Sequence, residues 1–297
     1  MIMESHSDGE LWGIAPVDDN TIITSADDNK IKSWDINQRK CIQTGQISDS
    51  ARNAPKGGAS TLSELPASQC SRGVAFNPTN HHIAVGHNDG TLTVRASPTK
   101  LNEIIAKNQD SQEWIEVLRY SPDGSKLAVG SHDNNIYIYE SSTYKLLGKL
   151  TKHNSFIVSL DWSQDGQYIR SVCGAHELLF FTADNFQQDP NGASNTKGTE
   201  WATNTAKFGW LVEGIFPSGT DGTHINGVDF SKDGQLIATG DDYGLVCLFR
   251  NPARVGHRPI SLRGHSEHVV RVQFHRNDQF LFSVGGYDQT LMQWKRS

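Results

Sequence analysis

The chain has 297 residues, of which 27 are glycine, and carries a formal net charge of −6. An acidic chain lacks the positive field that general nucleic-acid binders and binders of anionic membranes use, so we exclude both as partners. No apolar run approaches the roughly 18 residues of a membrane-spanning helix, no signal peptide is recognisable, and the four cysteines are far apart, as expected of reduced residues in a cytosolic protein.

A turn that begins with aspartate recurs along the chain, each time between two runs of β-forming residues. The copies begin at Asp28, Asp89, Asp133, Asp242 and Asp288, with Ala175 in the aspartate position of one further copy. Successive copies are 61, 44, 42, 67 and 46 residues apart. Periods of about 40 residues with several short strands per unit are typical of a β-propeller. The sequence therefore predicts an all-β fold, a single β-propeller domain over residues 1–297, with function left to the loops and the central face.

The third repeat shows the strands of one unit most clearly. Its expected strands are Trp114–Tyr120, Lys126–Gly130, Ile136–Glu140 and Tyr144–Leu150. A tight turn containing Pro122 and Gly124 joins the first two, because proline presets φ and glycine adopts conformations that other residues avoid. Nearly continuous apolar residues in the first and second strands are expected of a sheet buried between neighbouring blades.

Two segments interrupt the repeat. Residues 47–69 contain a stretch rich in glycine and small polar residues that cannot build a core, so we expect a mobile loop there. In the second interruption, residues 187–199 are polar and also expected to be mobile, whereas Glu200–Thr203 and Gly209–Pro217 are expected to be short strands of an irregular blade. Together with the six repeats, this piece predicts seven blades; six blades with an insertion is the alternative.

The last repeat ends on its third strand, which leaves its outer position open. An unpaired strand edge is a template for unwanted pairing. We therefore expect residues 1–4 to pair with residues 290–296 and close the ring. We also expect the blade around Ala175 to be less stable than its neighbours, because it lacks the aspartate.

Histidine, aspartate and tryptophan recur at nearly the same spacing in the first and last repeats. These sets are His6, Asp28 and Trp34, and His265, Asp288 and Trp294. With Ser25 or Ser283 they resemble a Ser/His/Asp catalytic set. A recurring set is better explained by structure, because a buried aspartate that accepts from turn amides and an imidazole offsets its own desolvation cost. We predict no catalytic residue and no enzyme, and we assign the same structural role to Asp89, Asp133 and Asp242.

No metal site and no cofactor are expected. His265 and His268 have the gap of some zinc ligands, but no nearby cysteine or carboxylate pair completes a set of four. His81, His82 and His87 bracket a strand and are better explained as surface and turn residues.

The spacing of the histidine, aspartate and tryptophan sets resembles the WD-repeat superfamily. A narrower resemblance, to the echinoderm microtubule-associated protein-like family, follows the family's order over almost the whole chain. Its motifs are Glu10–Gly13, Arg119–Gly124, Gly130–Tyr139, Leu160–Ser163, Glu200–Thr203, Ser218–Thr223, Thr239–Asp242 and Leu291–Trp294. The segment around Trp201 is no general feature of WD repeats, which makes the resemblance specific.

The resemblance is to the second, C-terminal WD-repeat propeller of the family's tandem propeller module. It implies a non-catalytic scaffold associated with microtubules or tubulin, in the cytoplasm and on the cytoskeleton. The family's first propeller and its N-terminal coiled coil have no counterpart in the sequence, so the chain is expected to be a fragment or a reduced member. A general WD-repeat adaptor in another protein complex is the alternative function, and a propeller enzyme or metal protein is a third, less favoured class.

Loops that lead into the first strands converge on one side of a propeller, where a rigid scaffold positions binding residues. The residues expected there are Trp12, Arg72, Trp114, Phe156 and His268, with Trp201 and Trp210 added by the irregular segment. Aromatic side chains and arginine dominate the energetics of interfaces. We predict that this side contacts the protein partner; the alternative is that most of these tryptophans pack between blades.

Overall fold

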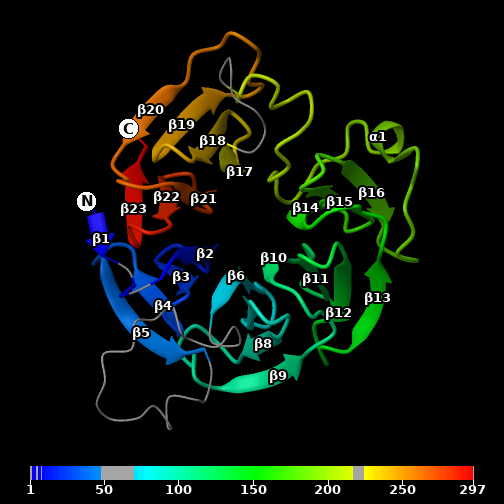
Figure 1. Cartoon of the computed structure of the whole chain (residues 1–297), viewed down its shortest axis with the longest axis horizontal. Helices are drawn as coiled ribbons and strands as arrows, with labels where there is room; N and C mark the ends of the chain where they lie inside the picture. The colour runs from blue at the N-terminus through cyan, green and yellow to red at the C-terminus, as the bar shows by residue number, and fades with distance from the viewer. Residues whose placement is uncertain (1, 5, 8, 48–69, 217–223, 297) are drawn as a thin grey trace.

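The computed structural model describes residues 2–4, 6–7, 9–47, 70–216 and 224–296, which form a ring of sheets around a central axis (Figure 1). These residues make six antiparallel sheets, five of four strands and one of three. The all-β propeller predicted from the repeat is therefore confirmed. Of the loop expected at residues 47–69, Ile47 is described and buried, whereas residues 48–69 lie outside the described residues, as does Pro217.

Each sheet is one blade, with its first strand nearest the centre of the ring and its last nearest the rim (Figure 1). Blade one contains β2 (Leu11–Pro16), β3 (Thr21–Ala26), β4 (Lys30–Asp35) and β5 (Lys40–Gln46). Blade two contains β6 (Ser71–Phe76), β7 (Ile83–His87), β8 (Leu92–Arg95) and β9 (Ile104–Asn108). Blade three contains β10 (Ile115–Tyr120), β11 (Lys126–Ser131), β12 (Ile136–Glu140) and β13 (Leu146–Leu150).

Blade four has three strands, β14 (Ile157–Trp162), β15 (Tyr168–Cys173) and β16 (Leu178–Thr182). Blade five contains β17 (Ile225–Phe230), β18 (Leu236–Asp241), β19 (Leu245–Arg250) and β20 (Ile260–Arg263). Blade six contains β21 (Val269–Phe274), β22 (Phe280–Gly285) and β23 (Thr290–Lys295), completed by β1 (Ile2–Glu4).

The ring is closed by its two ends. β1 pairs antiparallel with β23, with Ile2 opposite Met292 and Glu4 opposite Thr290. The N-terminal strand therefore occupies the outer position of blade six beside the C-terminal strand, as Figure 1 shows. The predicted closure is confirmed, and it removes the open strand edge.

The segment between blades four and five, which we call the insertion (residues 183–216), contains no strand of a seventh sheet within the described residues. Trp201 forms one isolated bridge to Ser163, and residues from Gly209 onward form turns in which Val212 N donates to Gly209 O. The expected strands of an irregular blade are not formed there: Gly209 has a φ of +140°, Val212 N and Ile215 N donate to carbonyls three residues earlier, and Gly214 N donates to Ala253 O. Six blades with an insertion describe this part of the chain.

The insertion nevertheless fills a sector of the disc. Val212 and Ile215 are buried against Ile225, Ile237 and Phe249 of blade five. Its polar part, expected to be a loose loop, contains the short helix α1 (Gly192–Asn195), whose residues pack near β16. The insertion thus supplies apolar contacts where a propeller of regular blades would place another sheet.

The core lies between blades rather than inside one layer. Separate clusters of buried apolar side chains join blades one and two, two and three, three and four, five and six, and six and one. The blades approach closely at glycines on the second strands: a Cβ atom added to Gly130 would lie 2.7 Å from Ile157 Cγ2 of the next blade. Adjacent blades are therefore matched in shape at the positions where the sequence places small residues.

Within the residues described, α1 is the one helix, and no helix is long and apolar enough to cross a membrane. All four cysteines are free thiols, and Cys173 is buried.

Candidate functional site

The histidine, aspartate and tryptophan of blade one form a buried chain of hydrogen bonds. His6 Nδ1 lies 2.9 Å from Asp28 Oδ1, and His6 Nε2 lies 2.9 Å from Thr24 Oγ1. The hydroxyl in this chain belongs to Thr24 rather than Ser25, and it also accepts from Trp34 Nε1 at 2.8 Å. Because the Asp28 carboxylate can only accept, His6 Nδ1–H donates to it, and Nε2 of the neutral ring then accepts from the Thr24 hydroxyl. Burial lowers the pKa of His6, which favours this neutral form.

Blade six repeats the arrangement. His265 Nδ1 lies 3.0 Å from Asp288 Oδ2, and its Nε2 lies 2.7 Å from Ser283 Oγ, which accepts from Trp294 Nε1 at 2.8 Å. Burial opposes ionisation of Asp288, but hydrogen bonds from His265 and Thr290 lower its pKa to about 2. In neither set does the hydroxyl face a cavity beside a histidine that is free to act as a base. Both sets therefore fit a structural role in hydrogen-bonded turns.

The remaining aspartates are placed differently. Asp133 accepts from Tyr137 and from Ser111, which takes the place of histidine in blade three. Tyr139 takes the place of tryptophan there, and its hydroxyl donates to Asp110. Asp89 accepts from the amide of its own turn at Thr91. Asp242 departs from the expected role: it accepts from Asn226 on the exposed face. In its stead, Asp241 accepts from the turn amides of Tyr243 and Leu245.

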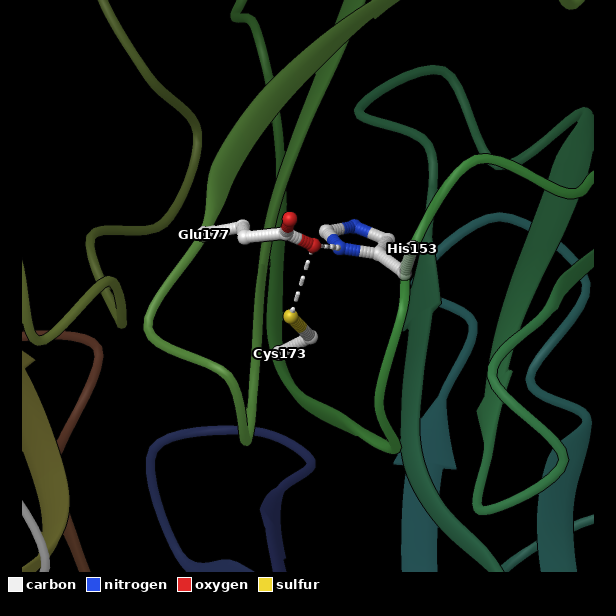
Figure 2. Close-up of side chains that lie close together, drawn as sticks. All are labelled: His153, Cys173 and Glu177. Atoms are coloured by element: carbon white, nitrogen blue, oxygen red, sulfur yellow. Dashed lines mark hydrogen bonds and ion pairs between the residues drawn. The ribbon is translucent and has the colours of Figure 1, made fainter.

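Blade four replaces the missing aspartate with a glutamate (Figure 2). Glu177 accepts from Asn154 N at 3.2 Å and from Asn154 Nδ2 at 2.7 Å. Asp28 and Asp288 accept from the equivalent amides of Ser7 and Ser266. The sequence analysis missed Glu177 because its carboxylate comes from a residue two positions after Ala175 and reaches back with a longer side chain.

Four of the five residues expected on the binding side form one continuous row. The Arg72 guanidinium lies 3.8 Å from the ring centroids of both Trp12 and Trp114. From Trp114 the row continues through His132, at 5.0 Å between ring centroids, to Phe156, stacked on His132 at 4.7 Å. Trp114 and Phe156 remain 38% and 41% exposed, so the row leaves aromatic surface accessible to solvent.

His268, the fifth residue, precedes β21 on blade six, the neighbour of blade one. It contacts Tyr287 at 5.7 Å, and on blade five His224 stacks on Tyr243 at the same distance. Tyr243 and Tyr287 are 65% and 66% exposed, although the sequence analysis named neither. The hairpin turns that carry them therefore extend the aromatic surface to blades five and six. We call the side of the disc that carries the row, His268, Tyr243 and Tyr287 the mouth face.

A cavity of about 310 Å³ opens at the centre of the mouth face. Its wall combines residues of blades one, three, four, five and six with residues of the insertion. The aromatic and imidazole residues of the wall are Trp12, Phe156, His176, Phe208 and His268, and its charged residues are Glu116, Lys207 and Asp242. A concave site of this size with few charged groups has the general form of a ligand or peptide site.

Charged residues at the inner wall of this cavity form a network. Glu116 lies 2.8 Å from His132 Nε2 and 3.2 Å from Arg271. Burial opposes the ionisation of Glu116, but these two neighbours hold its pKa below the ordinary value. Burial lowers the pKa of Lys207 to about 8, with Glu116 opposing the shift. A partner group that enters the cavity therefore meets a partly desolvated ammonium.

The two tryptophans of the insertion lie away from the cavity wall. Trp201 bridges to Ser163, at the hairpin turn between β14 and β15, and the Arg170 guanidinium lies 4.2 Å from its ring. That turn is at the opposite end of the blade from the loop that leads into β14. Trp210 is 60% exposed and lies beside Arg254. Phe208 and Lys207 are the insertion's contribution to the cavity.

Comparisons with known proteins agree on the type of domain. A family model described as the echinoderm microtubule-associated protein second β-propeller matches residues 11–296. The chain is 60% identical over 296 residues to the ciliary WD repeat-containing protein ctxp80 of Euplotoides octocarinatus. It is 35% identical over 302 residues to the 77 kDa echinoderm microtubule-associated protein of Strongylocentrotus purpuratus, and 35% identical over 300 residues to human echinoderm microtubule-associated protein-like 1.

These alignments cover 99% of this chain but only 41%, 40% and 34% of the three relatives, respectively. A chain in the crystal structure of the mitotic checkpoint complex superposes with a TM-score of 0.74 over 100% of this chain and 91% of that one, at 12% sequence identity. At that identity the superposition shows the shared propeller fold alone.

Proposed function

From the premise that this chain belongs to the echinoderm microtubule-associated protein-like family as its second β-propeller, we propose that it is a non-catalytic interaction module that associates with tubulin or microtubules. The relatives named as microtubule-associated proteins support the class of partner. Cytoplasm and cytoskeleton are the corresponding proposed locations. Because the relatives are more than twice as long as the matched region, the proposal concerns what this propeller contributes to binding.

The observation that carries the proposal is the mouth face. It carries exposed Trp114, Phe156, Tyr243 and Tyr287, of which Phe156 also lines the cavity, and aromatic residues supply much of the binding energy in protein interfaces. The histidines of the sets that resemble a catalytic arrangement are hydrogen-bonded to the aspartates of the turns. We therefore propose that partner recognition, rather than chemistry, takes place on this face.

The net charge of the chain limits the kind of contact that it can make with an acidic partner. The chain has a net charge of −6, so long-range attraction to an acidic surface such as that of tubulin does not come from the whole molecule. Lys207, Arg72 and Arg271 lie at or near the cavity, and any such attraction must be local to them. We propose that desolvated aromatic contacts supply most of the affinity.

The test is binding of the chain to microtubules by co-sedimentation and to tubulin dimers by size-exclusion chromatography. The test variant replaces Phe156, Tyr243 and Tyr287 with alanine. Its matched control replaces Ile42, Ile105 and Leu147, which are exposed on the outer strands, with alanine. We expect the first variant to weaken binding at least about 10-fold, and the control to bind as the unmodified chain does.

Equal affinity of the two variants would refute the mouth face as the contact surface. Binding of the unmodified chain to neither form of tubulin would refute microtubule association through this propeller. In that case a general WD-repeat adaptor remains, and the same pair of variants identifies its contact face.

A further inference from the structure

Three potential metal ligands converge in blade four. His153 comes from the loop before β14, Cys173 ends β15, and Glu177 precedes β16 (Figure 2). One ligand atom from each lies within 4.8 Å of the other two, and Cys173 Sγ is 3.4 Å from Glu177 Oε2. Across the part of the chain that the structure describes, this is the one group of three histidine, cysteine or carboxylate side chains gathered so closely.

The His153 ring presents a lone pair to this cluster. Its side chain is 0% exposed, and its Nδ1 atom has no hydrogen-bond partner: the nearest carboxylate oxygen, on Glu177, is 4.0 Å away. In blades one and six the equivalent nitrogen of His6 and His265 lies 2.9 and 3.0 Å from a carboxylate. Blade four therefore lacks the N–H···O bond that satisfies the other two histidines.

The cause is a substitution on the third strand. Register places Phe181 opposite Ile169, where blade six has Trp294 opposite Leu281. Phenylalanine has no N–H to donate to Ser171 Oγ, which lies 2.6 Å from His153 Nε2 and has both lone pairs available to accept from it. With the proton on Nε2, Nδ1 is left unprotonated, and it is the atom that a metal ion would use.

The thiol has room in this blade because the carboxylate has moved. Cys173 occupies the register position of Gly285 in blade six, where an added Cβ would lie 2.5 Å from His265 Nδ1 and closer still to Asp288 Oδ1. In blade four the carboxylate belongs to Glu177 rather than to an aspartate at position 175, so the space beside the histidine is available to the Cys173 sulfur. Nitrogen, sulfur and oxygen donors therefore face one point, each from a different segment.

We propose that His153, Cys173 and Glu177 bind one Zn²⁺ ion, as a clip that joins the loop before β14 to the β15–β16 hairpin. Imidazole, thiolate and carboxylate are the ligand types of zinc sites, and tetrahedral bonds of roughly 2.0–2.3 Å require the most distant donor atoms to close by up to about 1 Å. Binding releases the Cys173 thiol proton to solvent as the thiolate forms. The clip stabilises the blade that has three strands and a phenylalanine, Phe181, in place of the third-strand tryptophan.

The surroundings of the cluster support this assignment. Asn154 holds Glu177 through two hydrogen bonds, and Ser171 Oγ lies 2.6 Å from His153 Nε2 and orients the ring, which are the supporting contacts that metal ligands commonly have. Cys173 also lines the cavity of the mouth face, which provides a path for the ion and a direction for a fourth, non-protein ligand.

The test uses the chain without a histidine tag, stripped with a chelator and titrated with Zn²⁺ or Co²⁺. We expect one ion per chain, a Co²⁺ spectrum with visible bands of a tetrahedral site and a thiolate charge-transfer band, and a higher Tm with Zn²⁺. Cys173→Ser should remove the charge-transfer band and weaken zinc binding at least about 100-fold, and Asn154→Ala should weaken it about 10- to 100-fold.

The matched control is Cys247→Ser, because Cys247 is a half-buried strand cysteine whose thiol lies 3.6 Å from Ser261 Oγ and outside the cluster. This variant should bind zinc as the unmodified chain does. Circular dichroism verifies that each variant is folded. Should Cys173→Ser fail to fold, Glu177→Gln provides the same comparison with Co²⁺. Binding that survives in these variants, or a Co²⁺ complex without a thiolate band, marks an adventitious ion only and overturns the proposal.

Discussion

Replacing Asp288 with alanine removes the acceptor of four hydrogen bonds in the blade that closes the ring. The donors are His265 Nδ1 and Ser266 N at 3.0 Å, Thr290 N at 3.0 Å and Thr290 Oγ1 at 2.8 Å. Ser266 N is exposed and regains a bond to water, whereas His265 is fully buried. The loss is therefore dominated by one buried N–H left without its acceptor.

An unsatisfied buried donor costs about 1–3 kcal/mol, and loss of the turn bonds adds to it, so we expect a total of about 2–3 kcal/mol. Thr290 Oγ1 lies 2.9 Å from His265 Nδ1 and can accept in part, which keeps the loss from being larger. The corresponding fall in Tm is on the order of 5 °C.

The pH dependence has a definite sign. The pKa of Asp288 is about 2 in the folded chain, below its ordinary value of 3.8. Its contribution is therefore complete above the ordinary pKa and disappears as pH falls toward 2. The stability difference between the unmodified chain and Asp288→Ala should be constant from pH 7 to about 5 and shrink below pH 4.

Urea unfolding at pH 7, 4 and 3 measures this difference. Asp19→Ala, at an exposed turn position, is the control and should change stability by no more than about 0.5 kcal/mol. A loss from Asp288→Ala no larger than that of the control, or a difference that persists unchanged at pH 3, would refute the assignment of Asp288 as a structural acceptor.

Burial raises the pKa of Asp229 to about 7, so ionisation of this carboxyl lowers the stability of the fold as pH rises from about 4 to 7. In thermal melts, Asp229→Asn should therefore be more stable than the unmodified chain by about 2–4 kcal/mol at pH 8 and by little at pH 4. Arg72→Ala should lower stability by about 1–3 kcal/mol in urea unfolding, because it removes both stacked tryptophan contacts and the bond to Asn88, and a loss below about 0.5 kcal/mol would contradict this. In hydrogen exchange, amides of β16 should exchange faster than those of β12. The reason is that β12 is paired along its outer edge with the full strand β13, whereas β16 has one isolated bridge there, Phe181 to Gln188. Equal protection of the two strands would show that the carboxylate of Glu177 compensates fully for the missing aspartate.

The turns were predictable because their chemistry is local. Asp28, Asp133 and Asp288 are each followed by a residue with positive φ: Asn29 at +60°, Asn134 at +70° and Gln289 at +54°. In blade five the positive φ falls at Gly244, so the position equivalent to these aspartates is Tyr243 rather than Asp242. An alignment of aspartate letters cannot detect this shift of one residue, because it depends on backbone conformation.

The mouth face was predictable only in part, because its inner wall depends on closure of the ring. The loops that lead into first strands indicated Trp12, Arg72 and Phe156 from the repeat alone. Glu116 and Arg271 interact although they are 155 residues apart, and no local pattern indicates that pair. Lys207 comes from the insertion, which has no repeat to place it.

The insertion contributes both to the stability of the disc and to the wall of the cavity in the mouth face. Val212 and Ile215 pack against blade five, and a few residues earlier Lys207 and Phe208 enter the cavity wall. A segment that only filled the sector between blades would need the apolar residues alone, and a segment that only bound a partner would not need to be buried against a blade. Deletion of the insertion would confound the two roles, because loss of the apolar contacts would unfold blade five. Substitutions at Lys207 and Phe208 leave Val212 and Ile215 in place, and they separate what the insertion contributes to recognition from what it contributes to the fold.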